Sequence, residues 1–290
     1  MEILESTLRL LQSSPLWLFS LTTILGLLVG SFLNVVIYRL PIILERDWKQ
    51  QCAELNGQSI DDNTQTYNLV VPRSRCRNCQ QLIKAWQNIP ILSYLLLKGR
   101  CPNCGTKISL QYPLVESLTA VISIWAVIEF GFSWKTGAAL LFSWSLIALS
   151  IIDLQKTLLP DNITLPFLWL GLLINTTGLF AKPVDAIVGA AAGYLTLWSV
   201  YWIFKKITGK EGMGYGDFKL LAMLGAWFGW QALPLLILLS SAAGAVIGIS
   251  LILFAGHKRQ IPIPFGPYLA IAGWVYLLFS GKLHAFWPIP

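Results

Sequence analysis

The chain has 290 residues, of which 55% are hydrophobic and only 12% are charged. A soluble domain carries about 25% charged residues, and the mean hydropathy here is +0.63, so composition excludes a soluble globular protein and indicates a membrane-embedded one. The net charge of +7 would favour nucleic-acid binding in a soluble protein, but in a membrane protein basic residues act first as topology signals.

Eight apolar stretches are predicted as membrane helices. The first, residues 16–37, is long enough to cross a bilayer and too long for the core of a signal peptide. Within it, Gly26 and Gly30 form a G-x-x-x-G pair, which allows close helix packing. The sixth is short, so we expect it to be tilted or buried against its neighbours. The seven helices after the first are predicted at 114–132, 137–152, 163–180, 184–204, 218–230, 233–255 and 267–281.

A single long polar stretch, 41–112, divides the chain into three predicted domains. These are 1–40 with the first transmembrane helix, the polar region 41–112, and a transmembrane core over 113–290. The first part of the polar region, 42–69, shows no strong periodicity. If the polar region lies in the cytosol, 17 of the 21 Lys and Arg residues fall on the cytosolic side. This asymmetry follows the positive-inside rule and predicts that both termini are periplasmic.

Four of the five cysteines form two Cys-x2-Cys pairs in the polar region, Cys76/Cys79 and Cys101/Cys104. Two such pairs supply the four thiolates of a tetrahedral zinc site, and a site with no open position is structural. Four unpaired thiols and a redox disulfide are the alternatives, and a reducing cytosol disfavours the disulfide. Cys52 lacks a partner and is interpreted as a bystander.

Two aspartates stand at the ends of apolar runs, where a charge is costly. Asp153 follows the run 140–152, and Asp217 lies between the glycine-rich stretch 212–216 and the run 220–228. The three glycines are expected to let the backbone turn sharply. The predicted topology places both acids on the cytosolic side. Two carboxylates held together share one proton, so that one activates a water and the other donates to a scissile carbonyl. The pair predicts an aspartyl peptidase at the membrane surface.

Each of these acids could instead have a structural role. Asp217 could be a helix N-cap, although a cap does not explain three glycines in five residues. Asp153 could be a solvated residue just past a helix end. Asp161, which follows Pro160, is interpreted as the N-cap of the fourth helix. No Gly-Lys-Ser/Thr follows the glycines, which argues against a nucleotide-binding loop.

The chain resembles the bacterial prepilin peptidases, also called type IV leader peptidases, over nearly its whole length. Each matching stretch is moderately specific, and the set in this order is very specific. The resemblance rests on the stretches 30–41, 88–94, 99–101 and 112–116, both cysteine pairs, the block 153–161, the Gly-x-Gly-Asp of 214–217 and the Ile-Pro-Phe-Gly-Pro of 263–267.

The resemblance implies a bifunctional enzyme of the bacterial inner membrane. It implies cleavage of the leader from type IV prepilins and type II secretion pseudopilins at the cytosolic face, with Asp153 and Asp217 as the catalytic pair. It also implies N-methylation of the new terminal residue by S-adenosylmethionine, and it links the polar region to that second activity. The residues that bind S-adenosylmethionine, the oligomeric state and the roles of Lys156 and Lys219 are left unassigned.

A polytopic transporter is the alternative from another functional class. Carboxylates inside a membrane also mark ion pathways, and helices broken at Gly or Pro mark binding sites in transporters. Here, however, both acids lie at one face of the membrane rather than at its midplane. The two halves of the chain also show no inverted repeat.

Overall fold

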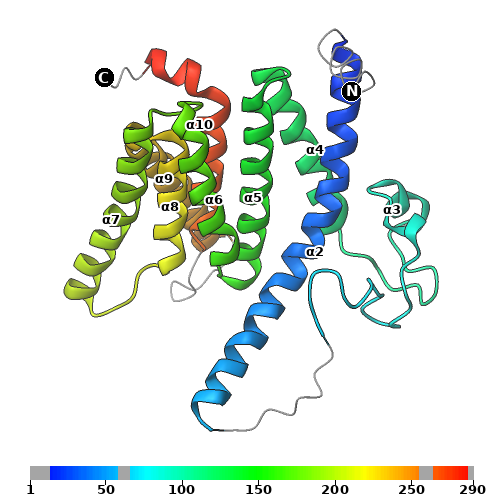
Figure 1. The fold of residues 1–290 in the computed structure, drawn as a ribbon. Helices are drawn as coiled ribbons and strands as arrows, with labels where there is room; N and C mark the ends of the chain where they lie inside the picture. Colours follow the sequence, from blue (N-terminus) through cyan, green and yellow to red (C-terminus); the bar gives the residue numbers. More distant parts are fainter. Residues whose placement is uncertain (1–13, 58–65, 255–263, 287–290) are drawn as a thin grey trace. The chain divides into compact units, whose positions relative to one another are not determined.

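The computed structural model describes residues 14–57, 66–254 and 264–286, and within these residues the chain is all-helical with no strand (Figure 1). The chain forms two compact units, Met1–Phe132 and Ser133–Pro290. Each of the eight predicted helices overlaps a helix of the structure.

Two long helices form the first unit, α2 (Pro15–Leu55) and α4 (Gln111–Phe130). They approach each other closely where the two glycines of the G-x-x-x-G pair face α4. A Cβ on Gly26 would lie 2.7 Å from the Cα of Ala120, and a Cβ on Gly30 would lie 2.7 Å from the Cα of Glu116. The prediction that this pair allows close packing is confirmed. The short helices η1 (Ala85–Asn88) and α3 (Leu92–Leu96) lie in the connection between α2 and α4.

Helix α2 continues well beyond its predicted end at residue 37. Residues 42–55 lack an apolar stripe but are rich in Leu, Glu, Gln, Lys and Ala, which are good helix formers. The helix ends at Leu55 with Asn56 as its C-cap, and Gly57 follows with a φ of +66°, a conformation that favours glycine. At about 1.5 Å per residue, its 41 residues span about 60 Å. That is roughly twice the ~30 Å hydrocarbon core of a bilayer, so α2 is long enough to extend well beyond it.

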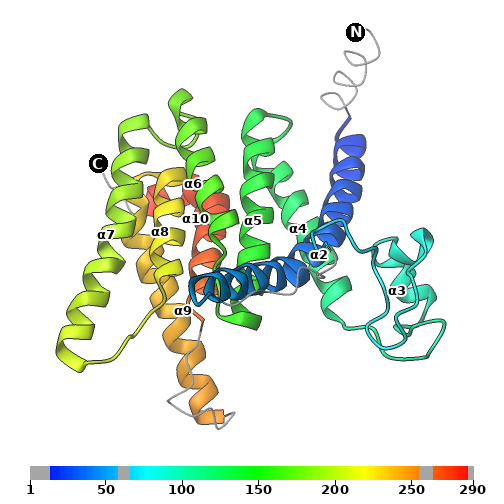
Figure 2. The same cartoon turned by 60° about the horizontal axis from the view of Figure 1, so that its bottom comes forward.

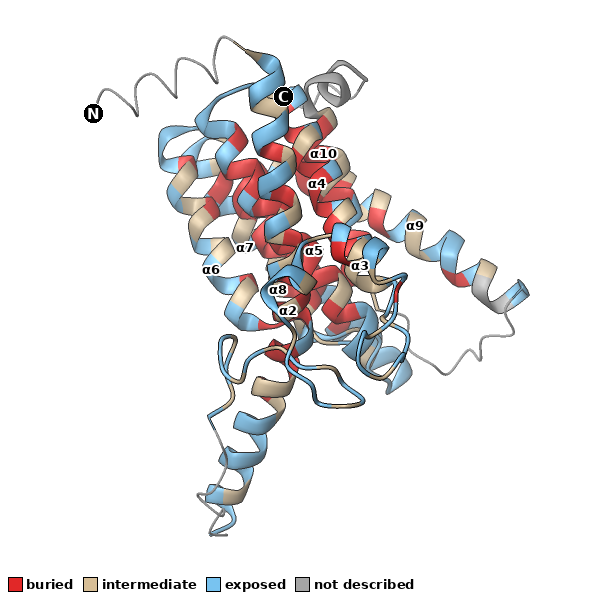
Figure 3. Cartoon of the chain, turned by 90° about the vertical axis from the view of Figure 1, so that its right-hand side faces the viewer, coloured by how far each residue is buried: buried red, intermediate tan, exposed pale blue. Residues whose placement is uncertain are grey.

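The described residues of the second unit form six α-helices, and α8 lies at their centre. Helix α8 contacts α6, α7, α9 and α10, while α5 contacts α6 and α10. Buried residues gather on α5 and α8 (Figure 3). The short sixth helix is predicted to be tilted or buried against its neighbours. The second alternative is confirmed, because α8 has only 14 residues and is buried against its neighbours. The six are α5 (Trp134–Lys156), α6 (Asp161–Ile174), α7 (Pro183–Thr208), α8 (Tyr215–Phe228), α9 (Leu233–Phe254) and α10 (Gly266–Phe286).

The far end of α8 is fixed by two buried side chains. Asn175 donates hydrogen bonds from its amide to the carbonyls of Ala226 and Trp227, at 2.8 and 2.9 Å. These are among the last carbonyls of the helix, which lack partners within it. The indole of Trp227 donates to the carbonyl of Phe167 at 2.8 Å. The position of α8 along the bundle is therefore set, and with it the position of Asp217 at the opposite end.

Among the described residues, five helical stretches are long and apolar enough to cross a membrane: 15–55, 111–130, 134–156, 183–208 and 230–250. The chain is therefore an all-α membrane protein, as composition predicts. Helices α6 and α8, with 14 residues each, are shorter than the roughly 20 residues of a typical span. The count of eight spans remains a prediction.

Candidate active site and candidate metal centre

The structure brings Asp153 and Asp217 together within the second unit. Asp153 lies in the last turn of α5 and Asp217 in the first turn of α8. Because consecutive helices of this unit run in alternating directions, these two ends and the beginning of α10 lie at the same end of the bundle (Figure 2). Both side chains are buried, with 5% and 7% of their surface exposed. The two carboxyl groups lie close enough to interact electrostatically.

Gly266, the first residue of α10, holds the carboxylate of Asp153. Its backbone N–H donates a hydrogen bond to Asp153 Oδ2 at 2.9 Å in a buried position. A Cβ on Gly266 would lie 2.6 Å from that same oxygen, so no larger residue fits without displacing the acid. Sequence reasoning assigned this glycine no role. The signal that could have found it is its place in the Ile-Pro-Phe-Gly-Pro block, where α10 begins at the same end of the bundle.

An apolar side chain, Leu159, lines the site. It is 8% exposed, and a Cβ on Gly216 or Gly266 would lie 2.7 or 3.1 Å from its carbon atoms. On the other side of the pair, Asp217 Oδ1 is buried with no hydrogen-bond partner among the described residues. Burying such an oxygen without a partner costs about 1–3 kcal/mol. The pair thus presents one carboxylate fixed by a backbone donor and one with an oxygen free to accept or share a proton.

The glycines before Asp217 lie in the connection from α7 to α8 and at the start of α8. None of Gly212, Gly214 and Gly216 has a positive φ, and Gly214 adopts an extended conformation at −81°, 151°. Two of the three leave space for a neighbouring side chain. A Cβ on Gly212 would lie 2.9 Å from the ring of Phe204, and one on Gly216 would meet Leu159. Close packing therefore requires glycine at Gly212 and Gly216, while the expected sharp turn stays a prediction.

The prediction that Asp161 caps the fourth helix is also wrong. The N-cap position of α6 is Pro160, and no side chain caps the helix. The carboxylate of Asp161 instead binds Lys219, whose Nζ lies 2.8 and 2.6 Å from its two oxygens. Lys219 follows Asp217 by two residues on α8. The ion pair therefore joins the N-terminal ends of α6 and α8.

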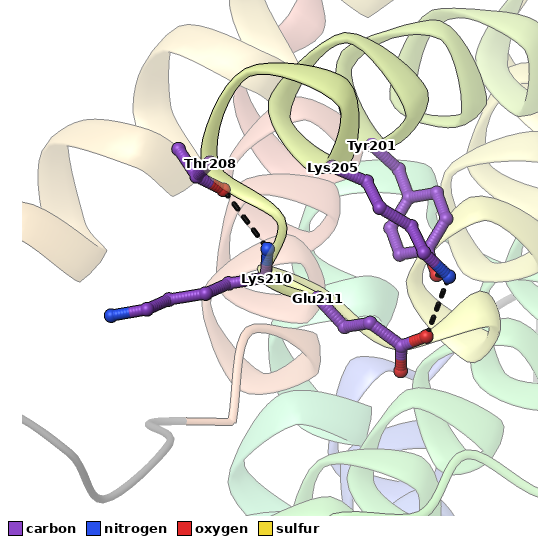
Figure 4. A network of polar contacts seen from close by, with 5 residues as sticks. All are labelled: Tyr201, Lys205, Thr208, Lys210 and Glu211. Atoms are coloured by element: carbon purple, nitrogen blue, oxygen red, sulfur yellow. Dashed lines mark hydrogen bonds and ion pairs between the residues drawn. The ribbon is translucent and has the colours of Figure 1, made fainter.

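A separate polar network holds the loop that leads from α7 into α8 (Figure 4). Lys205 donates to Glu211 at 2.8 Å and to the hydroxyl of Tyr201 at 3.3 Å. The hydrogen bond from Lys205 lowers the pKa of Glu211. The backbone N–H of Lys210 donates to the hydroxyl of Thr208 at 3.2 Å. These contacts restrain the loop outside the buried site.

The four cysteines predicted as metal ligands also come together, within the first unit. Their sulfur atoms all lie within 4.8 Å of one another. The sulfurs of Cys76 and Cys104 are 3.8 Å apart, which matches the separation of about 3.8 Å that a tetrahedral zinc with Zn–S bonds near 2.3 Å requires. Cys52 lies on α2 and is exposed, outside this cluster. The donor set therefore fits a metal ion.

Each cysteine pair lies in a tight turn of the same design. In the first turn the N–H of Gln80 donates to the carbonyl of Cys76, and in the second the N–H of Gly105 donates to that of Cys101. Gln80 and Gly105 both have positive φ, at 58° and 71°. The hydroxyl of Thr106 lies 3.3 Å from the sulfur of Cys104, and hydrogen bonds to the side chain and backbone of Thr106 are the main causes that lower the pKa of the thiol to about 6. The thiolate is the form that binds a metal.

Comparison with known proteins gives matches along both parts of the chain. Residues 24–130 match the family model of the bacterial peptidase A24 N-terminal domain, and residues 140–249 match that of the type IV leader peptidase family. No solved structure gives a significant match.

Several curated proteins are similar to the chain over most of its length, and each bears the name prepilin leader peptidase/N-methyltransferase. One from Stutzerimonas stutzeri is 55% identical over 275 residues, covering 95% of each chain. One from Aeromonas salmonicida is 56% identical and covers 95% of this chain and 96% of its own. One from Burkholderia pseudomallei is 47% identical and covers 90% of this chain and 85% of its own.

Proposed function

Because the chain belongs to the type IV leader peptidase family, we infer that it cleaves the leader peptide of prepilins and N-methylates the residue that cleavage exposes. It is a peptidase and a methyltransferase in one chain. The buried acid pair of α5 and α8 is the observation that carries the peptidase activity, since a pair of adjacent carboxylates can hydrolyse a peptide bond without a metal or a covalent intermediate.

Asp153 and Asp217 are the proposed catalytic pair, with different roles. The N–H of Gly266 donates to Asp153, and a hydrogen bond to the charged form of an acid favours that form. Asp153 is therefore assigned as the general base that activates a water. Asp217, buried beside that charge, keeps the shared proton and donates it to the scissile carbonyl. Because the two acids interact, they titrate as a pair.

The polar region 41–112 is proposed to support methylation, and 113–290 to form the peptidase core after the first segment, 1–40. S-adenosylmethionine supplies an electrophilic methyl group to the new terminal amine. A structural zinc ion on Cys76, Cys79, Cys101 and Cys104 would hold the polar region in shape, because its closed set of four thiolates leaves no position for a substrate.

The proposed substrates are type IV prepilins and type II secretion pseudopilins, processed at the cytosolic face of the bacterial inner membrane. Two features support this location. The Lys and Arg residues are concentrated in the segments that the predicted topology assigns to the cytosol. The two acids also lie at one end of the helical bundle, where they can reach a bond just outside the bilayer.

Mass spectrometry of a pilin N-terminus tests both activities at once. Purified enzyme is incubated with membrane-anchored prepilin, with and without S-adenosylmethionine. We expect loss of the leader in both samples and one added methyl group only with the donor. Intact prepilin after incubation with folded enzyme would contradict the proposal. A transporter would instead show uptake into proteoliposomes without cleavage.

A further inference from the structure

The segment 85–96, which comprises η1, α3 and the residues between them, exposes a cluster of large apolar side chains. Their exposed fractions range from 45% to 66%. Surface apolar residues that gather in this way usually mark a contact with a partner or a membrane. The cluster consists of Trp86, Ile89, Leu92, Leu95 and Leu96.

A buried acid anchors this segment to α4. The backbone N–H of Ile91 donates to Glu116 Oε2 at 2.8 Å, and Glu116 is only 6% exposed. Ile91 has a φ of +57°, which is unfavourable for a β-branched residue. Such a conformation persists only where the surroundings hold it, so the bond to Glu116 fixes where the segment lies along the helix.

The place of the anchor along the predicted span of α2 puts it at an expected depth within the membrane. Glu116 packs against Gly30 of α2, because a Cβ on that glycine would lie 2.7 Å from the Cα of Glu116. Gly30 lies seven residues before the end of the apolar run 16–37, or about 10 Å along the helix axis. In Figure 1, α3 lies to one side of α2, level with the upper half of that helix. At this depth α3 would contact lipid instead of water.

The surroundings of the segment suit a lipid interface. On α4, Leu114 and Leu118 are also exposed and extend the apolar surface at the same level. The segment is flanked by exposed basic residues, Lys84 and Lys98, which can reach anionic headgroups while apolar residues enter the acyl region. Tryptophan, present here as Trp86, is enriched at this boundary.

We propose that the segment 85–96 is an interfacial element whose apolar cluster inserts at the boundary between lipid headgroups and acyl chains beside α2 and α4. The segment would anchor the cysteine region to the membrane surface. The prediction concerns lipid as the occupant; a pilin helix or another part of the chain on this surface would contradict it.

Site-specific photo-crosslinking tests the proposal in proteoliposomes of phosphatidylethanolamine and phosphatidylglycerol. Benzoylphenylalanine replaces Leu95 or Leu96 in the full chain, and Lys107, exposed in the second cysteine turn, serves as the control position. We expect the two leucine positions to give several-fold more lipid adduct than position 107. Equal yields, or adducts mainly with added pilin or within the chain, would overturn the proposal.

The role of the anchor is tested by variants of Glu116 that carry the crosslinker at Leu95. Glu116→Ala removes the acceptor for Ile91 and should lower the lipid-adduct yield several-fold. Glu116→Gln keeps an oxygen acceptor and should retain most of it. Prepilin cleavage by each variant reports folding independently. An unchanged adduct yield in an active Glu116→Ala variant would show that the bond does not set the depth of the segment.

Discussion

At the scale of single residues, the hydrogen bond from Gly266 is the contact that orients the site. It holds one oxygen of Asp153 at 2.9 Å, and the space for it exists only because residue 266 has no side chain. A backbone donor costs no side-chain entropy to position, so it can fix a carboxylate more rigidly than a flexible side chain can. With Asp153 as the proposed base, cleavage would depend on a residue that has no reactive group.

Gly266→Ala should therefore abolish most of the cleavage. Its Cβ would lie 2.6 Å from Asp153 Oδ2, and a displacement of about 1 Å in a catalytic group can lower the rate on the order of 100-fold. The measurement is cleavage of anchored prepilin. Gly137→Ala is the matched control, because a Cβ there meets nothing within 4 Å, and it should be active. A Gly266→Ala enzyme with the wild-type rate would refute the positioning role.

The ion pair of Asp161 and Lys219 should position α8 rather than stabilise the fold. The side chains are 48% and 29% exposed, and pairs with this exposure contribute at most about 1 kcal/mol. Lys219→Met should lower kcat for cleavage with little change in thermal stability, and Lys219→Arg should restore part of it. Glu211→Gln, which breaks the pair with Lys205, is the control and should retain activity. Equal effects of Lys219→Met and Glu211→Gln would contradict this view.

At the scale of elements, hydropathy predicted where helices occur because an apolar run must be helical inside a bilayer. It could not predict that α2 continues to Leu55, since that part is polar and depends on helix propensity. Cysteine spacing predicted the cluster because the chemistry of four ligands lies within the motif itself. The contacts of Gly266 with Asp153 and of Lys219 with Asp161 join distant parts of the chain, and no local pattern encodes such tertiary contacts.

The cysteine cluster is expected to bind about one zinc ion per chain, as four thiolates in a closed set do. Metal binding contributes directly to folding, so Cys101→Ser should loosen the polar region and raise its sensitivity to protease. Cys52→Ser should change neither property. Elemental analysis of the purified protein decides the first point, and a metal content near zero in a folded, active sample would refute it.

At the scale of the whole molecule, the enzyme is expected to act on a substrate that is itself in the membrane. The acids lie at one end of a membrane bundle, so a bond just outside the bilayer reaches them when the apolar helix of the pilin is inserted. Anchoring supplies positioning that a free peptide lacks. A soluble peptide that spans the cleavage site should be cut much more slowly than anchored prepilin. Equal rates for the two substrates would rule out this form of positioning.

The central claim is that Asp153 and Asp217 act as one catalytic unit, and cleavage of anchored prepilin by four variants at equal folded levels tests it. Asp153→Asn and Asp217→Asn should each abolish cleavage. The double variant should lower the cleavage rate little further than either single variant, because the effects of residues that act as a unit are strongly non-additive. Asp161→Asn should be milder. Methylation of a pilin that is already cleaved should survive in all four, which shows that they are folded. Substantial cleavage by either single variant of the pair, or an Asp161→Asn enzyme as inactive as they are, would contradict the account.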